Sequence, residues 1–277
     1  MTKTVSKRLE VIKFDSLFEM LQYCKEGIGK TVCGKLGSEY KGVRETQWSG
    51  SSSLSKAIEI GVNGWEEGAN LIKHHLDKLS AVGTATTLIP QYEVSGDSVD
   101  VGRFLSGEPE NMLNWLEAES EGHKIVDVYF NCSVGARTAT ESIIRYGSAA
   151  LTAIDYLEQN GYRCNLYIYF GFHKGSLDRS VIVKIKDAHG SLNISTAAFC
   201  IAHPSYLRRL MLKIIELNRN WHQKGYGTPR EATSEELEGN CVYFNMMRTT
   251  EFSFMDDAHI QQYLSGKLPS VLNELKN

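Results

Sequence analysis

The apolar positions in the second half of the chain predict alternating strands and helices. Residues 125–130 form an almost continuous apolar run interrupted by Asp127, as expected of a strand covered on both faces of a parallel sheet. Residues 146–159 place apolar side chains on one face of a helix, and residues 165–172 form a second strand-like run. The spacing from strand through helix to strand indicates a right-handed βαβ crossover. This half is therefore predicted to be α/β.

Further elements follow towards the C-terminus. Residues 179–196 predict another strand and a tight turn at His189 and Gly190. Pro204 opens a helix with a buried apolar stripe. Residues 241–247 predict a final strand and residues 258–264 a short helix. No motif recurs at a fixed period, so a solenoid is not indicated.

The first part of the chain has mainly helical patterns. Ser16 and Glu19 have capping-box spacing before an apolar periodic segment, so a helix is expected to begin near Ser16. Residues 27–53 are rich in Gly, Ser, Lys and Thr and predict a loop, and a second helix begins near Ser53. A third helix has its apolar stripe at Trp65, Ala69, Ile72, Leu76 and Leu79.

Two groups of polar residues in this part are candidates for a functional site. His74 and His75 are adjacent on a helix, whereas helical metal pairs prefer a spacing of four, so no metal site is predicted there. Residues 95–97 predict a turn, and Pro109 is expected to precede another helix. Asp97, Asp100 and Arg103 are interpreted as exposed turn residues rather than as a site.

Composition and charge narrow the class of protein. The chain has 277 residues, 42% of them hydrophobic and 23% charged, which is typical of a globular protein with a sizeable core. With a net charge of −3, the molecule as a whole lacks the excess of positive charge that is typical of proteins that bind nucleic acid. The six cysteines lack a CxxC pair and are interpreted as reduced thiols. Because no apolar run approaches about 20 residues, we expect a cytoplasmic protein, including the host cytoplasm if the gene is viral.

The segment "NCSVGART" follows the strand at residues 125–130, where ligands bind in open α/β sheets. With the order of elements around it, this segment resembles the von Willebrand factor A-like fold over residues 122–247. The resemblance implies an α/β sheet flanked by helices. We therefore expect a mostly helical region, residues 1–120, packed on a von Willebrand A-like domain, residues 121–277.

Metal-binding members of that family have an Asp-x-Ser-x-Ser pattern, which the resemblance places on Asn131, Ser133 and Gly135. Ser133 alone matches, because Asn131 replaces a carboxylate and Gly135 has no side-chain ligand. A weak Mg²⁺ site with Ser133, Thr196 and Asp178 is one alternative. A metal-free scaffold loop without any cofactor is the preferred interpretation.

The phrases "QWSGSSSLSKAIEIGVNGWEEGANLI" and "VSGDSVDVGRFLSGEPENMLNW" resemble segments of an uncharacterised family encoded by phages and mobile elements. This resemblance implies no activity. The glycines in these phrases are expected to end helices, and the tryptophans, Trp48 and Trp65 among them, to anchor one element against another.

Motifs of catalysis are scarce in this sequence. Neither GxxxxGK[ST], GxGxxG nor GxSxG occurs. Cys132 at a strand end is a candidate nucleophile with His173 or His203 as its base, provided that the base lies within hydrogen-bond reach. Enzymatic activity is therefore the third hypothesis, behind two binding functions.

The preferred hypothesis is a non-catalytic interaction module of a phage or mobile element. It would bind a protein partner through loops at the carboxyl ends of the strands, with Asn131, Ser133, Arg137 and Thr138 at the centre. The alternative is a single-stranded nucleic-acid-binding accessory protein in phage transcription or replication, because aromatic side chains stack on bases and cations neutralise phosphates. Its candidate residues are Tyr167, Tyr169, Lys174, Arg208, Arg209 and Lys213.

Overall fold

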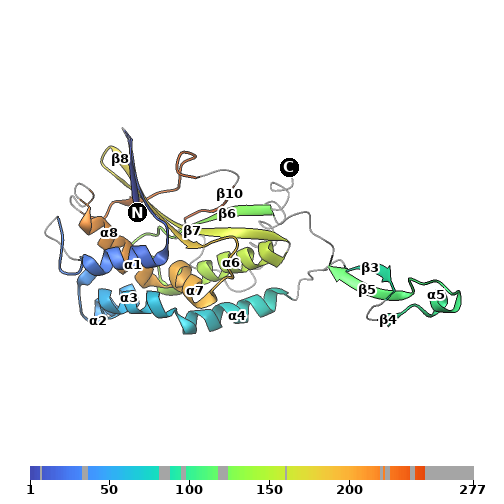
Figure 1. The fold of residues 1–277 in the computed structure, drawn as a ribbon. Coiled ribbons are helices and arrows are strands. Elements are labelled where there is room, and N and C mark those ends of the chain that lie inside the picture. Colours follow the sequence, from blue (N-terminus) through green and yellow to red (C-terminus); the bar gives the residue numbers. More distant parts are fainter. Residues whose placement is uncertain are drawn as a thin grey trace.

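The computed structural model describes residues 1–6, 8–32, 37–80, 88–94, 98–117, 124–159, 161–218, 221, 225–237 and 241–246. Its main feature is a seven-stranded sheet with the order β1-β2-β8-β7-β6-β10, in which β9 also pairs with β7. Figure 1 shows helices gathered on one side of this sheet. The predicted α/β class, with a sheet flanked by helices, is confirmed.

The strands of this sheet come from both ends of the chain. They are β1 (Thr2–Val5), β2 (Leu9–Phe14), β6 (Lys124–Asn131), β7 (Tyr162–Lys174), β8 (Leu177–Lys186), β9 (Thr228–Pro229) and β10 (Cys241–Phe244). Residues 9–14 form a strand parallel to β8, so the N-terminal region adds to the sheet as well as carrying helices. The division of the chain at residue 120 stays a prediction.

The centre of the sheet is the predicted βαβ unit. Helix α6 (Thr140–Gln159) connects β6 to β7, and the two strands are parallel, with Asn131 opposite Tyr169. β8 then returns antiparallel to β7, after a turn in which Gly175 has a φ of 67°. β10 lies parallel to β6 on its other side. The sheet is therefore mixed rather than wholly parallel.

The expected N-terminal helices are present. α1 (Leu17–Glu26) begins after Ser16, whose hydroxyl accepts a hydrogen bond from the backbone N–H of Glu19, and α3 (Leu54–Asn63) begins after Ser53 in the same way. α4 spans Glu66–Ser80, although the side chains of its residues 74–80, His74 and His75 included, lie outside the described residues.

The prediction of a continuous loop over residues 27–53 is wrong in part. A 3₁₀ turn, η1 (Gly37–Glu39), and a short helix, α2 (Val43–Ser49), form there. α2 ends at Gly50, which has a φ of 75° in the left-handed region. Short helices without a long apolar stripe give little periodic signal in the sequence.

The helical layer and the sheet share the main hydrophobic core. α7 (Ile194–Ala202) is followed, after Pro204, by η2 (Tyr206–Met211), a π-helix, and by α8 (Leu212–Leu217). Nearly every side chain from η2 to Glu216 is buried, the charged ones included. The predicted helix after Pro204 is thus confirmed, but it is buried all round rather than along one stripe.

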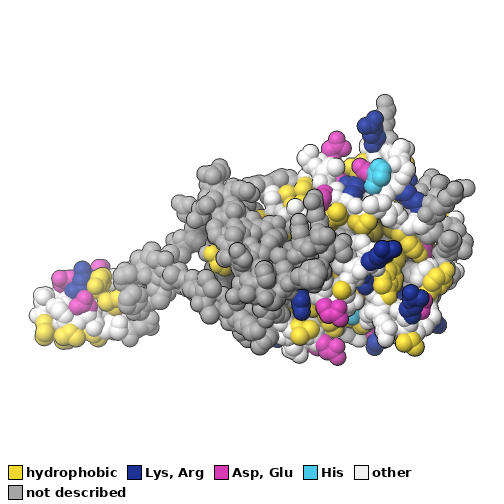
Figure 2. All heavy atoms as spheres, turned by 180° about the vertical axis from the view of Figure 1, so that it is seen from behind, with side chains coloured by type: hydrophobic (Ala, Val, Ile, Leu, Met, Phe, Trp, Pro, Cys, Tyr) yellow, Lys and Arg dark blue, Asp and Glu magenta, His cyan; other side chains and the backbone are white. Residues whose placement is uncertain are grey.

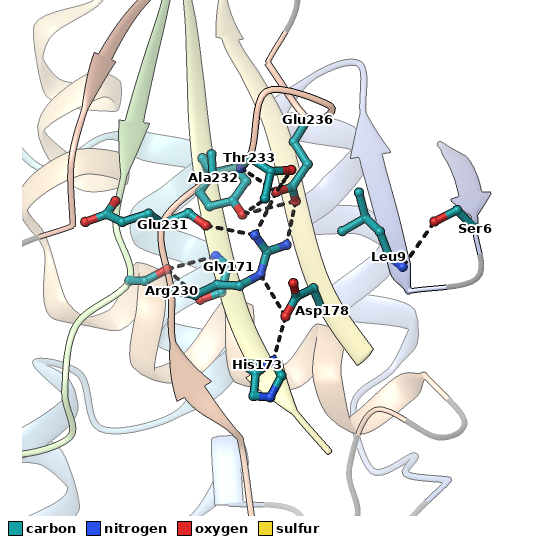
Figure 3. A network of polar contacts seen from close by, with 12 residues as sticks. Ser6, Leu9, Gly171, His173, Asp178, Arg230, Glu231, Ala232, Thr233 and Glu236 are labelled. Atoms are coloured by element: carbon teal, nitrogen blue, oxygen red, sulfur yellow. Dashed lines mark hydrogen bonds and ion pairs between the residues drawn. The ribbon is translucent and has the colours of Figure 1, made fainter. Parts of the chain in front are cut away.

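The opposite face of the sheet has a smaller apolar cluster around Val11, Tyr129, Tyr169 and Ile182. Ala232 and Leu237 pack against this cluster, and the nearby Arg230 donates two hydrogen bonds of 2.7 Å to Glu236 (Figure 3). Burial opposes the charge on Glu236, but the hydrogen bonds from Arg230 prevail and lower its pKa. The hydroxyl of Tyr169 on β7 also donates to Glu236 at 3.1 Å, which ties residues 230–237 to the sheet.

A second, three-stranded sheet consists of β3 (Leu88–Glu93), β4 (Ser98–Val99) and β5 (Met112–Glu117), with α5 (Val101–Leu105) beside it. Figure 1 shows it standing apart from the seven-stranded sheet. The prediction of a helix after Pro109 is wrong, because the strand β5 forms there. The expected turn at residues 95–97 and the expected helix at residues 258–264 lie outside the described residues.

None of the helices in the described ranges combines the length and the apolar character that crossing a membrane requires. The five cysteines for which the structure describes a side chain are free, and Cys24, Cys132, Cys164 and Cys200 are buried. Cys241 is half-buried. That these cysteines are reduced stays a prediction.

Candidate binding site at the carboxyl end of β6

The loop after β6 is held from inside by buried polar side chains. Asn131 and Ser133 are both fully buried. The hydroxyl of Ser133 donates to the carbonyl of Gly171 at 3.0 Å and accepts from its N–H at 2.8 Å, which ties the loop to β7. The Asn131 amide donates to the Tyr243 hydroxyl at 2.8 Å, and its oxygen accepts from the N–H of Ser133 at 2.9 Å. These two residues position the loop.

The residues that the von Willebrand factor A-like resemblance places at metal positions do not fit a metal ion. The oxygen atoms of Asn131 and Ser133 already make the hydrogen bonds that shape the loop. Asp178 lies 2.7 Å from the imidazole of His173. Thr196 lies on α7, and its N–H donates a hydrogen bond to the side-chain oxygen of Asn193, which caps the helix. Within the described residues, no three His, Cys, Asp or Glu side chains form a group that could hold a metal.

A pocket of about 120 Å³ opens beside this loop. Residues 134–136 form one wall, and the other walls come from distant parts of the chain. These walls are formed by Trp48 on α2, Phe170 and Phe172 on β7, Leu207 and Arg208 on η2, Leu212 on α8, and Tyr226, Gly227 and Pro229. The carboxyl end of β6 therefore carries a concave surface, as expected at such an edge of an α/β sheet.

Arg208 joins the two sides of this pocket. Its guanidinium donates one hydrogen bond to the carbonyl of Trp48 and another, of 2.6 Å, to the carbonyl of Thr138. The indole of Trp48 lies 4.8 Å from the guanidinium carbon and donates to the carbonyl of Ala136 at 2.9 Å. A cation–π contact and three hydrogen bonds thus fix the loop after β6 against α2 and η2.

The charge of Arg208 is buried without a compensating anion. The side chain is 2% exposed, and no ion pair joins it to a carboxylate in the part of the chain that the structure describes. Burial lowers the pKa of Arg208 to about 10. Its Nε and the hydroxyl of Thr138 are buried with no hydrogen-bond partner among the described residues. Buried polar groups normally have a hydrogen-bond partner, so these two atoms are exceptions.

The other two basic residues of this helix have internal partners. Arg209 is 1% exposed and donates to the carbonyls of Ser38, Tyr40 and Ser51. Lys213 is fully buried and binds Glu39 at 2.5 Å. These two cations therefore bind the N-terminal loops and do not form a solvated helix face.

The aromatic residues proposed for nucleic acid are also engaged. Tyr169 is fully buried and donates to Glu236 at 3.1 Å, whereas the half-buried Tyr167 stacks on Tyr129 with ring centroids 4.7 Å apart. Lys174 donates to the carbonyl of Gly225. On the face shown in Figure 2, the basic side chains of the described part lie scattered with acidic ones between them. Nucleic-acid binding stays a prediction that these contacts do not support.

Cys132 and His203 line a common cavity of about 10 Å³, which has room for about one water molecule. Burial raises the pKa of the Cys132 thiol far above its usual range and lowers the pKa of His203 to about 4. His203 Nδ1 already accepts a hydrogen bond from the N–H of Ser205. The thiol is held protonated, so the pair lacks the thiolate that nucleophilic catalysis needs.

None of the four residues predicted to bind a partner is among the residues that line the pocket. Arg137 is exposed, whereas Asn131, Ser133 and Thr138 are buried, and the carbonyl of Thr138 accepts a hydrogen bond from Arg208. The sequence did not reveal that Trp48, Arg208 and Tyr226 complete the site. Trp48 in "QWSGSSS" was an indication of a packing contact, but its partner, Arg208, lies 160 positions further along the chain.

The fold and pocket define a mixed α/β protein with a candidate binding site at the carboxyl end of β6. A family described as a domain of unknown function (DUF7192) matches residues 2–267, and the chain belongs to this family. A search of curated proteins and a search of solved structures each gave no match.

Proposed function

We propose that this protein is a non-catalytic binding module of a phage or mobile element, which engages a protein partner in the cytoplasm through the carboxyl end of β6. The observation that carries the proposal is the pocket of about 120 Å³, with the uncompensated Arg208 in its wall. A buried charge without an anion is costly, and binding a partner's acidic group relieves that cost.

The local backbone supports a site at this position. Arg208 lies on a π-helix, a rare conformation that is frequent at functional sites. The neighbouring loop presents Ala136 and Arg137 to solvent, whereas Asn131 and Ser133 hold its base rigidly. A rigid base with an exposed tip reduces the entropy that is lost on binding.

The proposal includes a von Willebrand A-like identity for residues 121–277. Its support is the order of elements: β6, α6 and β7 form a parallel crossover, β8 follows as an antiparallel neighbour, and β10 returns beside β6. In this protein the loop after β6 would bind through an arginine-lined pocket instead of a metal ion.

The test is affinity capture from native lysate, with and without nuclease, using three forms of the full chain. Gly135→Leu fills the pocket, because Gly135 lines it and an added Cβ there meets no atom closer than 3.8 Å. Gly190→Leu is the matched control, since Gly190 lies on an exposed turn and its added Cβ meets no atom closer than 3.5 Å.

A protein that resists nuclease and is retained by the wild type and Gly190→Leu, but not by Gly135→Leu, is the expected result. Equal retention by all three forms would contradict the site. Nucleic acid whose digestion releases every bound protein would favour the alternative function, single-stranded nucleic-acid binding.

A further inference from the structure

We propose that the small sheet formed by β3, β4 and β5 belongs to a docking arm, residues 88–117, which binds the surface around α2 of a second copy of this chain. This α2 surface consists of Tyr40, Lys41, Val43 and Arg44. None of these four residues lines the pocket beside β6, so the contact is independent of the function proposed above.

The arm has no hydrophobic core among the side chains that the structure describes. None of the described side chains of the arm is buried, those of α5 included. A sheet of three strands is stable by itself only when it has an apolar face that is covered. Figure 1 shows the arm standing apart from the helices and from the seven-stranded sheet. The described body of the same chain therefore leaves the apolar side of the arm uncovered.

The uncovered side chains lie together on the arm. Val101, Phe104 and Leu105 occupy positions i, i+3 and i+4 of α5, which places them on one side of that helix. They are 63%, 60% and 79% exposed. In Figure 2, apolar side chains gather along one edge of the arm. Large apolar side chains clustered at such exposure are typical of a protein–protein contact.

The charge of the arm defines the kind of surface that it binds. Residues 88–117 include six acidic residues and one arginine, a net charge of −5, whereas the whole chain has a net charge of −3. The rest of the chain therefore has a net charge of +2. The arginine, Arg103, is already engaged, since it lies 3.4 Å from Glu108 and stacks on Tyr92. An acidic arm repels nucleic acid and requires a partner surface that combines apolar with basic side chains.

The α2 surface has this combination. Tyr40 and Val43 are 57% and 78% exposed, and the two cations of the surface are exposed as well. The carboxylates next to them in the sequence belong to Glu39 and Glu45, and both residues are half-buried. Glu39 is also bound to the buried Lys213. The α2 surface therefore presents apolar and positively charged groups to a docking partner.

The placement of the arm favours a second copy over the same chain. Figure 1 shows the arm and α2 at opposite ends of the molecule, so the arm does not reach the α2 surface of its own chain. Two copies that lie antiparallel bring each arm to the α2 surface of the other, and such a pair is closed and makes the same contact twice. In this pair α5 packs against Val43. The exposed carboxylates of Glu108 and Glu110 face the two cations of the α2 surface.

The oligomeric state of the full chain tests this pair. Sedimentation velocity over a range of protein concentrations measures the mass of the particle, and we expect the wild type to form a dimer. Phe104→Ser with Leu105→Ser should give a monomer. Val5→Ser with Ile125→Ser is the matched control and should preserve the dimer, because these side chains are 62% and 54% exposed but lie on β1 and β6.

Reversal of charge tests whether the arm binds the α2 surface. The arm variant is Glu108→Lys with Glu110→Lys, and the α2 variant is Lys41→Glu with Arg44→Glu. Each variant alone places like charges in both contacts of the pair and should weaken the dimer at least about a hundredfold. An equal mixture of the two variants should form a mixed dimer, because every contact then joins opposite charges. Thermal melts verify that the variants fold, as expected for exposed positions.

A wild type that stays monomeric at every concentration overturns the proposal, and particles larger than a dimer overturn the closed pair. A dimer that survives Phe104→Ser with Leu105→Ser, or that is lost in the control as well, overturns the role of the arm. Failure of the two charge variants to associate when mixed overturns the α2 surface as the binding site. The lysate capture with Gly135→Leu tests the proposed function separately, because it depends on the pocket and not on the arm.

Discussion

His203 should make the protein less stable in mild acid. The side chain is 7% exposed, lies 4.7 Å from the Trp65 ring in an edge-on contact, and accepts a hydrogen bond of 3.1 Å from the N–H of Ser205. Burial lowers its pKa to about 4 in the folded state, compared with about 6.5 for an exposed histidine. The fold therefore requires the neutral imidazole.

The sign and size of the effect follow from this difference in pKa. The unfolded chain binds the proton more readily, so this contribution to stability is fully present above about pH 6.5 and is lost as the pH falls towards about 4. At about 1.36 kcal/mol per pKa unit, the full loss is on the order of 3 kcal/mol, and about 2 kcal/mol of it has occurred by pH 5.

The assay is urea unfolding of the wild type and His203→Asn at pH 7.5 and pH 5. Asparagine keeps an acceptor for the N–H of Ser205 but does not titrate. The comparison of the two proteins cancels the other titrating groups. The free energy of unfolding of the wild type should fall by about 2 kcal/mol more than that of the variant. An equal fall in both proteins would mean that His203 is protonated as easily in the fold as in the unfolded chain, contrary to this prediction.

Three further predictions concern buried charges and the thiol. Glu236→Gln should lower the free energy of unfolding by about 3 kcal/mol at pH 7, because it leaves the largely buried Arg230 with only its longer, 3.7 Å contact to Asp178. The difference in stability between variant and wild type should narrow as acid protonates Glu236; urea unfolding at pH 7 and pH 4 measures both, and a difference that stays constant would count against the pair. Lys213→Met should destabilise the fold by on the order of 3 kcal/mol, because Glu39 loses its buried cation, and a thermal melt that matches the wild type would disprove this. Cys132 should react with a thiol reagent far more slowly in the native protein than in urea, because burial raises the pKa of its thiol, and fast native labelling would reopen the nucleophile hypothesis.

Local patterns were sufficient to predict much of the α/β half. The apolar runs at residues 125–130 and 165–172 correspond to β6 and β7, and the periodic helix between them makes the crossover that their spacing predicted. The strand at residues 9–14 was missed, although "LEVIKF" alternates apolar and polar positions over part of its length. Its place in the sheet depends on pairing with β8, about 170 positions away, which a local pattern does not report.

The sequence predicted where the candidate site lies but not which residues form it. The carboxyl end of β6 follows from a general rule of α/β sheets, so the loop at residues 131–138 could be singled out from sequence alone. Whether its side chains point outward could not, because Asn131 and Ser133 are buried by contacts with distant backbone. The burial of Arg208 was equally invisible, since a basic residue on a helix is normally exposed.

Site-specific photo-crosslinking tests the central claim, a partner-binding site at the carboxyl end of β6, most directly. A photoreactive amino acid is placed at exposed Arg137 in one variant and at exposed His189, on the turn that also carries Gly190, in the other. Both variants are irradiated in nuclease-treated native lysate. We expect a defined protein adduct from position 137, absent when Gly135→Leu is added, and none from position 189. Adducts of equal yield at both positions, or an adduct at position 189 alone, would contradict it.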